Sequence, residues 1–368
     1  MPKLRFNKYN KIEIKKIIEF APLQRGYDLP VNKIESGNYP VVFSNGILKE
    51  HNQYKVKGPG IVTGRSGTIG KVTYVKNDFW PHNTSLFVTN FFDNIPKYVY
   101  YYYQHIDFSK FATGSGVPTL NRNDLHSLDV SVPEKEEQTQ IANFLSSVDE
   151  KITLLNKQYD LLCQYKKGMM QKIFSQELRF KDENGGEFPE WEYGSISELI
   201  TNKSKKYNPQ CGIYYPCIEL DCISQEDGQL LNIVDSLQQK SIKNIFKKGD
   251  VLFGKLRPYL RKYIIAPFDG VCSSEIWVLK GILIKSCFLY QFVQTDFFIN
   301  LANKSTGSKM PRADWNTISS EFISYPCKEE QTKIANFLSA IDDKITAKKT
   351  ELDKLKIWKQ GLLQQMFV

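Results

Sequence analysis

Several features are missing from this sequence, and each absence argues against a class of protein. The seven cysteines are odd in number and form no CxxC pair, so neither disulfides nor a zinc site is expected, and a reducing cytoplasm fits. No run of about eighteen apolar residues occurs, which argues against a membrane-spanning helix. The opening stretch MPKLRFNKYNKIEIKK is charged and has no apolar core, unlike a secretory signal. We therefore expect a cytoplasmic protein without a membrane partner.

A glycine-rich stretch, GRSGTIGKV at residues 64–72, lacks the spacing of a nucleotide-binding loop. A Walker loop places four residues between its first Gly and a Gly-Lys pair, and a Ser or Thr hydroxyl after the Lys holds magnesium. Here five residues separate Gly64 from Gly70, and Val72 follows Lys71. An ATP-hydrolysing enzyme is therefore disfavoured, and the stretch needs another explanation.

The composition is that of a folded protein with room for two or three domains. Hydrophobic residues make up 41% of the 368 residues, and aromatic residues make up 13%. The formal net charge of +9 permits a polyanionic partner such as nucleic acid, although charge alone does not establish one.

An internal repeat organises the chain. PEKEEQTQIANFLSSVDEKIT begins at Pro133 and PCKEEQTKIANFLSAIDDKIT at Pro326, an offset of 193 residues with five differences. Farther upstream the offset becomes 190, where GIVTGR from Gly60 aligns with DVLFGK from Asp250. The LRF tripeptide of residues 4–6 recurs downstream of the first repeated helix, so the end of the chain followed by its beginning reads like its middle. The pattern indicates an internal pseudo-twofold arrangement with the two termini close together.

Two stretches, 134–174 and 327–367, contain no proline and follow a helical period. Their apolar residues recur at spacings of four and three, which is a heptad seam, and a helix of about 40 residues would be about 60 Å long. Lys166 and Lys359 interrupt equivalent seam positions, where they either face a partner protein or extend their charged ends into solvent; we favour the second. The residues expected in the seam between the helices are Leu145, Val148, Ile152, Leu155, Leu162, Leu338, Ile341, Ile345, Leu352, Leu355 and Leu362.

The connectivity predicts how the two helices pack. A lone helix of this length cannot bury its seam, so each copy is the expected partner of the other. The first helix delivers the chain to the second globular region and the second helix starts there, so the two helices must run antiparallel. Such a pair would hold the two globular regions at opposite ends and at a fixed separation. A coiled coil that serves only to bind another protein is the alternative.

These motifs together resemble the specificity (S) subunit of type I restriction–modification systems, over essentially the whole chain. The resemblance rests on the two EEQTxIANFLSxxDxKIT helices, each preceded by a Gly-Ser…Pro loop, and on LRFKDENGGEFPEWEYGSISELI at the start of the second region. The N-terminus departs from this pattern, because NKYNKIEIKKI replaces the Phe-Pro-Glu-Trp lead-in. The departure leaves the start of the first domain open.

The resemblance implies an α+β fold. Two similar globular target recognition domains of mixed α/β structure would be separated by two long antiparallel coiled-coil helices, related by a pseudo-twofold internal repeat. The implied boundaries are 1–132 for the first recognition domain, 133–177 for the first helix, 178–325 for the second recognition domain and 326–368 for the second helix.

The resemblance also implies a function. Each domain would read one half of a bipartite site in double-stranded DNA, while the helices would set the spacing and dock two methyltransferase (M) subunits. Restriction (R) subunits would complete the complex, and these partners, not this chain, would bind S-adenosylmethionine, ATP and magnesium. No Asn/Asp-Pro-Pro-Tyr/Phe methyltransferase motif, Walker pair or convincing nuclease carboxylate set occurs, in agreement with a non-catalytic subunit. The alternative function is a coiled-coil adaptor whose loops touch no DNA.

In this setting the glycine-rich stretch becomes a DNA-facing loop of the first domain. Its counterpart is GKLRPYLRK at 254–262, and the repeat aligns Arg65 with Lys255 and Lys71 with Arg261. Basic residues recur in both copies whereas the glycines do not, as expected if cations contact phosphates and variable residues read bases. A hairpin turn with surface Lys and Arg side chains is the alternative.

The same reasoning selects polar residues at matched places in both copies. HNTS at 82–85 aligns with CSSE at 272–275; these side chains could bind base edges or only satisfy their own turn. The run 98–103 could stack on bases but is more typical of core packing. The candidate DNA-binding residues are Arg25, Ser44, Asn45, Arg65, Ser66, Thr68, Lys71, His82, Asn83, Thr84, Thr119, Asn121, Arg122, Lys255, Arg257, Tyr259, Arg261, Lys262, Ser273, Ser274, Lys309 and Arg312.

Overall fold

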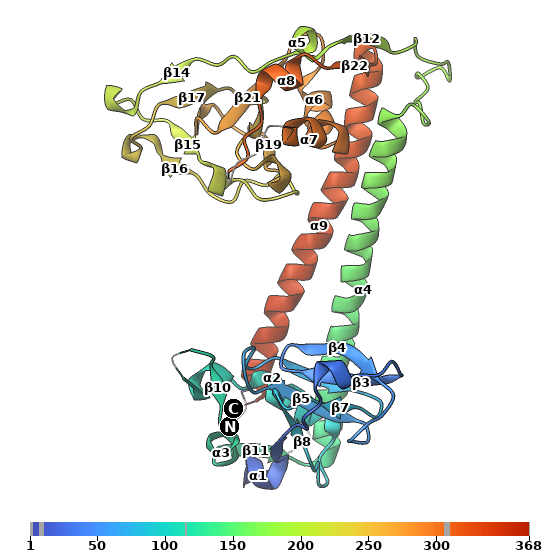
Figure 1. Cartoon of the computed structure of the whole chain (residues 1–368), viewed down its shortest axis with the longest axis vertical. Helices are drawn as coiled ribbons and strands as arrows, with labels where there is room; N and C mark the ends of the chain where they lie inside the picture. The colour runs from blue at the N-terminus through green and yellow to red at the C-terminus, as the bar shows by residue number, and fades with distance from the viewer. Residues whose placement is uncertain (1–2, 7–10, 115, 305–309, 368) are drawn as a thin grey trace. The chain divides into compact units, whose positions relative to one another are not determined.

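A computed structural model describes residues 3–6, 11–114, 116–304 and 310–367 of the chain. The chain forms two compact units: unit 1 is Met1–Gln158 with Lys348–Val368, and unit 2 is Tyr159–Ala347. Two long helices, α4 (Lys135–Phe174) and α9 (Lys328–Met366), each contribute a segment to both units (Figure 1). The two predicted long helices are therefore confirmed.

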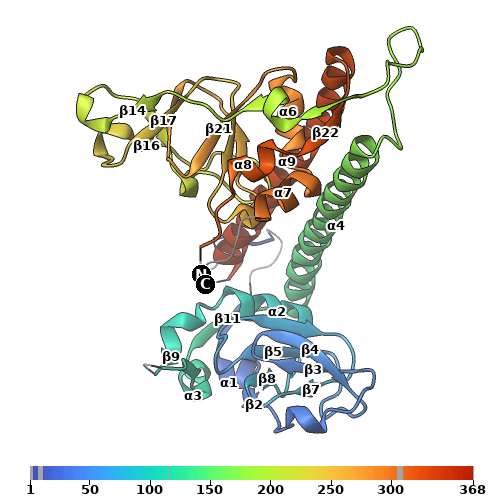
Figure 2. The same cartoon turned by 45° about the horizontal axis from the view of Figure 1, so that its top comes forward.

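Unit 1 combines two main β-sheets with short helices. Short runs rich in β-branched and aromatic residues, such as YPVVF and GIVTG, form its strands, as their extended-chain preference predicts. One sheet has the strand order β2-β8-β5-β6 and the other β4-β3-β7. Strands of both sheets are labelled in Figure 2. The main elements are β1 (Ile12–Lys16), α1 (Ile17–Phe20), β2 (Leu23–Arg25), β3 (Tyr39–Phe43), β4 (Gly46–His51), β5 (Gly60–Gly64), β6 (Val72–Val75), β7 (Trp80–Pro81), β8 (Ser85–Val88), α2 (Pro96–His105), β9 (Ala112–Thr113), β10 (Thr119–Leu120), α3 (Arg122–His126) and β11 (Asp129–Pro133).

Unit 2 repeats this plan with a larger second sheet. The order β13-β21-β18-β19 corresponds to β2-β8-β5-β6, and the second sheet has the order β14-β17-β20-β15-β16. In both units the second sheet contains one parallel pair, β3 with β7 or β15 with β20. The main elements are β12 (Glu192–Ser195), α5 (Ile196–Leu199), β13 (Ile200–Thr201), β14 (Lys206–Tyr207), β15 (Pro216–Ile218), β16 (Val234–Asp235), β17 (Lys243–Phe246), β18 (Val251–Gly254), β19 (Tyr263–Ile265), β20 (Gly270–Cys272), β21 (Ile276–Gly281), α6 (Ser286–Phe292), α7 (Asp296–Asn303), α8 (Trp315–Ser319) and β22 (Phe322–Tyr325).

The α4 and α9 segments of each unit pack on each other and on the globular part of that unit. In unit 1, Leu145 and Val148 of α4 share a buried cluster with Leu362 of α9. In unit 2, Ile173 of α4 shares a buried cluster with Leu338 of α9. Every predicted seam residue is buried or half-buried, as the heptad spacing leads one to expect.

Lys166 and Lys359 do not extend their charged ends into solvent. Lys359 pairs with Asp149 in unit 1 and Lys166 pairs with Asp342 in unit 2, each with an Nζ–Oδ1 distance of 2.6 Å. The solvent-directed interpretation is wrong because a carboxylate on the facing helix neutralises each ammonium, and the two lysine side chains are only 14% and 12% exposed. The number of residues from Asp149 forward to Lys166 on α4 equals the number from Lys359 back to Asp342 on α9. Antiparallel packing of the two helices requires this equality.

The tyrosine-rich run of α2 lies in the core of unit 1. Tyr98, Tyr101 and Tyr103 are 1%, 0% and 0% exposed, and Tyr98 lies 5.3 Å from the Phe367 ring between ring centroids. The core interpretation of this run is confirmed, because buried rings of this kind offer no face to an incoming base.

The N-terminal segment joins the end of α9 in unit 1. The backbone N–H groups of Lys3 and Leu4 donate to the Gln365 carbonyl at 2.8 and 3.0 Å. In unit 2 the equivalent hydrogen bond forms within continuous chain, from the Leu178 N–H to the Lys172 carbonyl at 3.0 Å. The two ends of the chain therefore meet where unit 2 has a short connection.

Matched buried ion pairs strengthen this equivalence. The Arg5 guanidinium binds the carboxylate of Glu137 near the start of α4, and the Arg179 guanidinium binds that of Glu330 near the start of α9. Both glutamates are 0% exposed. The repeated LRF tripeptide thus marks the place where the chain packs on the start of each long helix.

A circular permutant tests this equivalence. We join residue 368 to residue 1 and open the chain between Gln176 and Glu177. The permutant should unfold cooperatively within a few degrees of the parent, because the new ends lie in an exposed connector. Far-UV circular dichroism during heating measures this. A matched permutant opened between Leu252 and Phe253, inside the buried strand β18, should fail to fold; equal behaviour of both would contradict the prediction.

Candidate nucleic-acid interface

The loops selected from the sequence converge in unit 1. Arg65 and Ser66 follow β5, and their backbone N–H groups donate to the Thr84 carbonyl at 2.9 and 3.2 Å. The N–H of Ser44, which follows β3, donates to the Thr84 hydroxyl at 3.3 Å. Ser66 also forms a β-bridge with Thr119. We call this assembly loop surface 1, and it comprises Arg25 with residues 44–45, 65–71, 82–84 and 119–122.

Two arginines lie beside one backbone carbonyl on loop surface 1. The Arg25 Nε and the Arg65 Nη1 donate to the Asn83 carbonyl at 3.4 and 3.5 Å. Arg25 also pairs with Asp28 at 3.5 Å. A guanidinium has five N–H donors, so each arginine keeps donors for an outside acceptor.

His82 and Asn83 use their side chains within the loop. The His82 Nε2–H donates to the Leu29 carbonyl at 3.2 Å, and its Nδ1 accepts from the Thr84 hydroxyl at 3.0 Å. Burial lowers the pKa of His82, so the ring is neutral near pH 7. The Asn83 amide donates to the Asp28 carboxylate. These contacts favour the alternative in which the turn satisfies its own polar groups.

Other members of loop surface 1 face outward. Asn121 accepts a hydrogen bond from the Asn123 N–H at 3.1 Å and caps α3, which places Arg122 in the first turn of that helix. The exposed members are Arg25, Asn45, Thr68, Lys71, Asn121 and Arg122.

Unit 2 builds the same arrangement from different residues. The Lys255 N–H donates to the Glu275 carbonyl at 2.9 Å, as Arg65 donates to Thr84. Leu256 forms a β-bridge with Arg312, as Ser66 does with Thr119. The Arg312 Nε also donates to the Glu275 carboxylate at 3.0 Å. We call residues 255–262, 273–275 and 310–312 loop surface 2.

The structure corrects the alignment of the two copies by one residue in two places. Because Lys255 and Arg65 occupy equivalent positions, Thr84 corresponds to Glu275, not to Ser274. Strand pairing gives the second correction: Val72 pairs with Thr63 and Tyr263 pairs with Phe253, so Lys71 corresponds to Lys262. The predicted match of Lys71 with Arg261 is wrong, because the loop of unit 2 holds one more residue, within a turn that includes a short 3-10 helix.

The corrected alignment explains the glycines of the glycine-rich stretch. Gly67 and Gly70 both have φ of +81°, a left-handed conformation that suits glycine. Their counterparts Arg257 and Arg261 keep this conformation, with φ of +52° and +49°. The glycines therefore serve the turn, and not a phosphate ligand. An arginine held in this conformation is strained, and such strain is typical of residues whose side chains have a functional role.

Lys71 and Lys262 perform the same structural task. The Lys71 Nζ donates to the Asn45 carbonyl after β3, and the Lys262 Nζ donates to the Leu220 carbonyl after β15, both at 2.6 Å. Each lysine ties the β5–β6 or β18–β19 turn to the neighbouring loop. Lys71 remains exposed, whereas the Lys262 side chain is 13% exposed.

The remaining predicted residues of unit 2 differ in accessibility. Arg261 is held by the Asp296 carboxylate and the Gln294 carbonyl, and Ser273 is 8% exposed. Arg257, Tyr259 and Ser274 are exposed. Lys309 lies outside the described residues.

The prediction missed a group of lysines beside loop surface 2. The Lys206 Nζ, on β14, donates to the Asn244 side chain at 2.5 Å, and Asn244 donates to the Ser273 carbonyl at 3.4 Å. Lys203, Lys205 and Lys206 are all exposed. The signal for them was the charge cluster NKSKK at 202–206, which has no counterpart in the first copy and so escaped a search by repeats.

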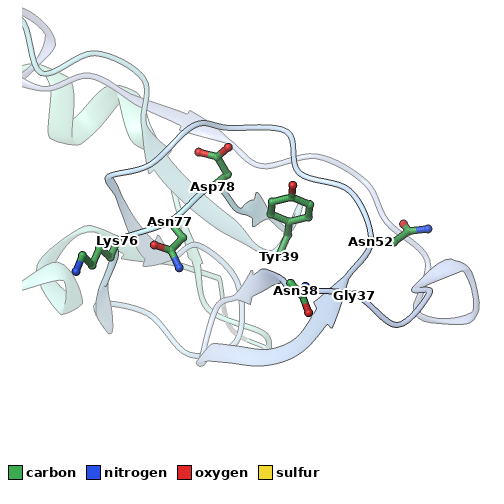
Figure 3. A pocket seen from close by; sticks show the side chains of 7 residues that line it. All are labelled: Gly37, Asn38, Tyr39, Asn52, Lys76, Asn77 and Asp78. Carbon is green, nitrogen blue, oxygen red and sulfur yellow. The ribbon is translucent and has the colours of Figure 1, made fainter.

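Unit 1 also contains a polar pocket (Figure 3). Tyr39 opens β3 and Asp78 precedes β7, and these strands are parallel, so the pocket lies at their starts. Loop surface 1 lies where the same strands end. The Asp78 carboxylate accepts from the Gly58 N–H at 2.9 Å and shapes the wall. The lining residues are Gly37, Asn38, Tyr39, Asn52, Lys76, Asn77 and Asp78.

Within the described part of the chain, no group of three or more His, Cys, Asp or Glu side chains could hold a metal ion. None of the helices described combines the length and the apolar character that a membrane crossing requires.

A protein-family model matches most of the chain. The model described as "Type I restriction modification DNA specificity domain" matches residues 9–164 and 171–356, and the chain therefore belongs to this family. The two matched segments correspond to the two halves of the internal repeat.

Curated relatives carry the same description. The type I restriction enzyme MjaVIII specificity subunit of Methanocaldococcus jannaschii is 26% identical over 272 residues, which cover 68% of this chain and 64% of that protein. The EcoDI specificity subunit of Escherichia coli is 24% identical over 254 residues, 60% of this chain and 56% of that protein. The chain thus matches less than two thirds of the length of these relatives.

Solved structures share the fold. The S subunit of a type I restriction–modification system from M. genitalium matches with a TM-score of 0.65 and 18% identity, over 100% of this chain and 99% of that one. A chain from a study of complex assembly and conformational transition of the type I R-M system matches with a TM-score of 0.51 and 14% identity, over 96% and 97%. At these identities the likeness concerns the fold.

Replacing Arg257 tests the strain in loop surface 2. Gly adopts the observed φ of +52° without the penalty of about 1–2 kcal/mol that an L side chain meets there. Part of this gain is offset by the greater chain entropy of Gly when unfolded. We expect Arg257→Gly to be about 0.5–1 kcal/mol more stable than the matched variant Arg257→Ala, measured by urea denaturation. A less stable Gly variant would mean that the turn does not need the left-handed conformation.

Proposed function

We propose that this chain is the DNA specificity subunit of a type I restriction–modification complex. Each unit binds one half of a bipartite site in double-stranded DNA, unit 1 through loop surface 1 and unit 2 through loop surface 2. The observation that carries the proposal is the duplicated loop geometry: the same backbone hydrogen bonds and bridges hold different side chains at equivalent positions. Two domains that bind different DNA sequences require a constant backbone scaffold and different side chains at the DNA-facing positions.

The side chains of the two surfaces divide into two roles. Exposed cations such as Arg25, Arg122 and Arg257 contact phosphates and supply affinity that does not depend on sequence. Exposed polar side chains such as Asn45 and Ser274 lie among them and reach base edges, where hydrogen-bond patterns distinguish base pairs. Lys203, Lys205 and Lys206, at and just before β14, extend the cationic surface of unit 2.

The long helices dock two M subunits. Trp358 of α9 is 49% exposed and its ring centroid lies 6.0 Å from that of Phe144 on α4. The repeat places Tyr165, 51% exposed, at the position of Trp358, and Phe337 at that of Phe144. An exposed aromatic residue duplicated on both units suits two copies of one partner, since aromatic residues are enriched at protein interfaces.

The chain supplies binding and not chemistry in this role. M subunits bind S-adenosylmethionine and methylate adenine, and R subunits use ATP and magnesium to move along and cleave DNA. A coiled-coil adaptor would account for the helices and their aromatic residues. It gives no reason for the duplicated cationic loop surfaces.

Sequencing of methylated adenines tests the proposed function. The chain is expressed with its M subunits in cells that lack other adenine methylation. We expect one bipartite sequence with a fixed spacer, meaning the unspecified base pairs between the two half-sites. Methylation without a bipartite pattern, or none in a complex that assembles, would contradict the proposal.

The salt dependence of DNA binding tests the role of the cations. Arg65 and Lys255 occupy equivalent positions directly after β5 and β18. Replacing either by Ala removes one phosphate contact, so the slope of log K against log salt should fall by about 0.9. Fluorescence titration of the complex with M subunits measures the slope. Lys76→Ala is the matched control, because this exposed lysine lines the pocket at the other end of the strands; an equal change there would contradict the assignment.

Lengthening both helices tests the spacing. We duplicate residues 152–155 of α4 and residues 353–356 of α9, which face each other in the antiparallel pair by the register of the two ion pairs. Four residues add about 6 Å and turn the helix by about 40° beyond a full turn. One base-pair step of DNA advances about 3.4 Å and turns about 35°. We expect a spacer longer by one or two base pairs in the methylated sites, and an unchanged spacer would contradict the role of the helices.

A further inference from the structure

A polar cluster interrupts the apolar contact between α4 and α9 in unit 1. Cluster 1 consists of Tyr101, Gln104, Ser146, Asp149 and Lys359, with the 2.6 Å ion pair of Lys359 and Asp149 at its centre. The Lys359 Nζ also donates to the Gln104 side chain at 3.1 Å, and the Tyr101 hydroxyl donates to Asp149 at 2.9 Å. Tyr101 and Gln104 belong to α2, so the cluster joins both long helices to the globular part of the unit.

Unit 2 contains the equivalent cluster. Cluster 2 consists of Gln291, Gln294, Ser339, Asp342 and Lys166, again centred on an ion pair of 2.6 Å. The Lys166 Nζ donates to the Gln294 side chain at 2.6 Å, and the Gln291 amide donates to Asp342 at 3.3 Å. Gln291 and Gln294 are 0% and 7% exposed.

The two clusters form the same hydrogen bonds although some of their side chains differ. Tyr101 of cluster 1 and Gln291 of cluster 2 differ in size and chemistry, yet each forms hydrogen bonds with the seam aspartate and with a neighbouring serine. Cluster 2 also adjoins loop surface 2, because the Gln294 carbonyl accepts a hydrogen bond from the Arg261 guanidinium at 3.3 Å. Both units hold the same ion pair in the same way, although the surrounding side chains differ.

The ion pairs allow one helix register. If α9 moved by one heptad against α4, the apolar seam would still face apolar positions. Lys359 would then face Ala142 or Asn156, and Lys166 would face Ala335 or Lys349. Every such slip, about 10.5 Å per heptad, separates both partly buried lysines from their two aspartates. A single polar group in an apolar seam is a known means of fixing register.

We propose that clusters 1 and 2 set the length of the DNA spacer, by fixing the register of α4 against α9 and the position of each globular part on the helix pair. This inference rests on the proposed function. Lys166, Asp342, Lys359 and Asp149 act as positioning residues: they touch no DNA, and they decide which spacer lengths let both half-sites bind together.

The double variant Asp149→Leu with Lys359→Met tests the proposal in the full chain expressed with its M subunits. Apolar residues of similar volume often replace a buried ion pair without loss of stability, so the melting temperature should hold. We expect methylation of sites with spacers one base pair longer or shorter to rise about tenfold, which corresponds to about 1.4 kcal/mol of lost discrimination. Methylome sequencing measures this rise.

Two control variants separate positioning from stability. Lys359→Arg keeps the charge, and we expect it to keep the single spacer. Ile17→Val lies in the buried core of unit 1, away from clusters and loop surfaces, and lowers stability slightly without a change of spacer. Broadening in Ile17→Val equal to that in the double variant would overturn the proposal.

The remaining outcomes are distinct. A wild-type complex that methylates no bipartite site contradicts the proposed function itself. A bipartite wild-type pattern with an unchanged spacer in the double variant overturns the positioning role alone. If the double variant does not accumulate, Gln104→Ala keeps the ion pair and removes the hydrogen bonds of Gln104 to Lys359 and to the Tyr100 hydroxyl; a single spacer in that variant also overturns the proposal.

Discussion

Two helices of about sixty ångströms carry apolar seams that neither can bury alone, and this constraint organises the chain. Each helix solves it by packing one segment in unit 1 and the other in unit 2. Burial of a leucine such as Leu145 or Leu338, each 0% exposed, contributes about 1.5–3 kcal/mol. Because each segment also enters the core of a globular part, the helices cannot separate without exposing the cores of both units.

The two loop surfaces depend on backbone geometry more than on particular side chains. The Arg65–Thr84 and Lys255–Glu275 hydrogen bonds are made by main-chain atoms, so they survive changes of residue type. The left-handed turn positions are kept in the same way, by glycine in unit 1 and by arginine in unit 2. A scaffold built from main-chain contacts leaves the outward side chains free to vary, which is the property that recognition of different DNA sequences would need.

Features that depend on neighbouring residues could be predicted from the sequence, whereas features that depend on contacts between distant residues could not. The two long helices and the core position of the tyrosine-rich run of α2 follow from local patterns, and both were predicted correctly. The match of Lys71 with Arg261 failed, because one extra residue in a loop without conserved neighbours leaves no trace in an ungapped alignment. The pairing of Lys359 with Asp149 was missed because the two residues are far apart in sequence. The lysines at 203, 205 and 206 were missed because this charge cluster occurs in one copy only.

The amino-acid sequence by itself determined the duplication, the two long helices and the family resemblance, because these reside in periodicities and motifs that neighbouring residues carry. Only the tertiary structure decided which loops converge, which lysines hold loops together and which lysines neutralise an aspartate on the facing helix. The physical reason is that hydrogen bonds and ion pairs depend on distances of about 3 Å between atoms whose separation along the chain imposes no such limit.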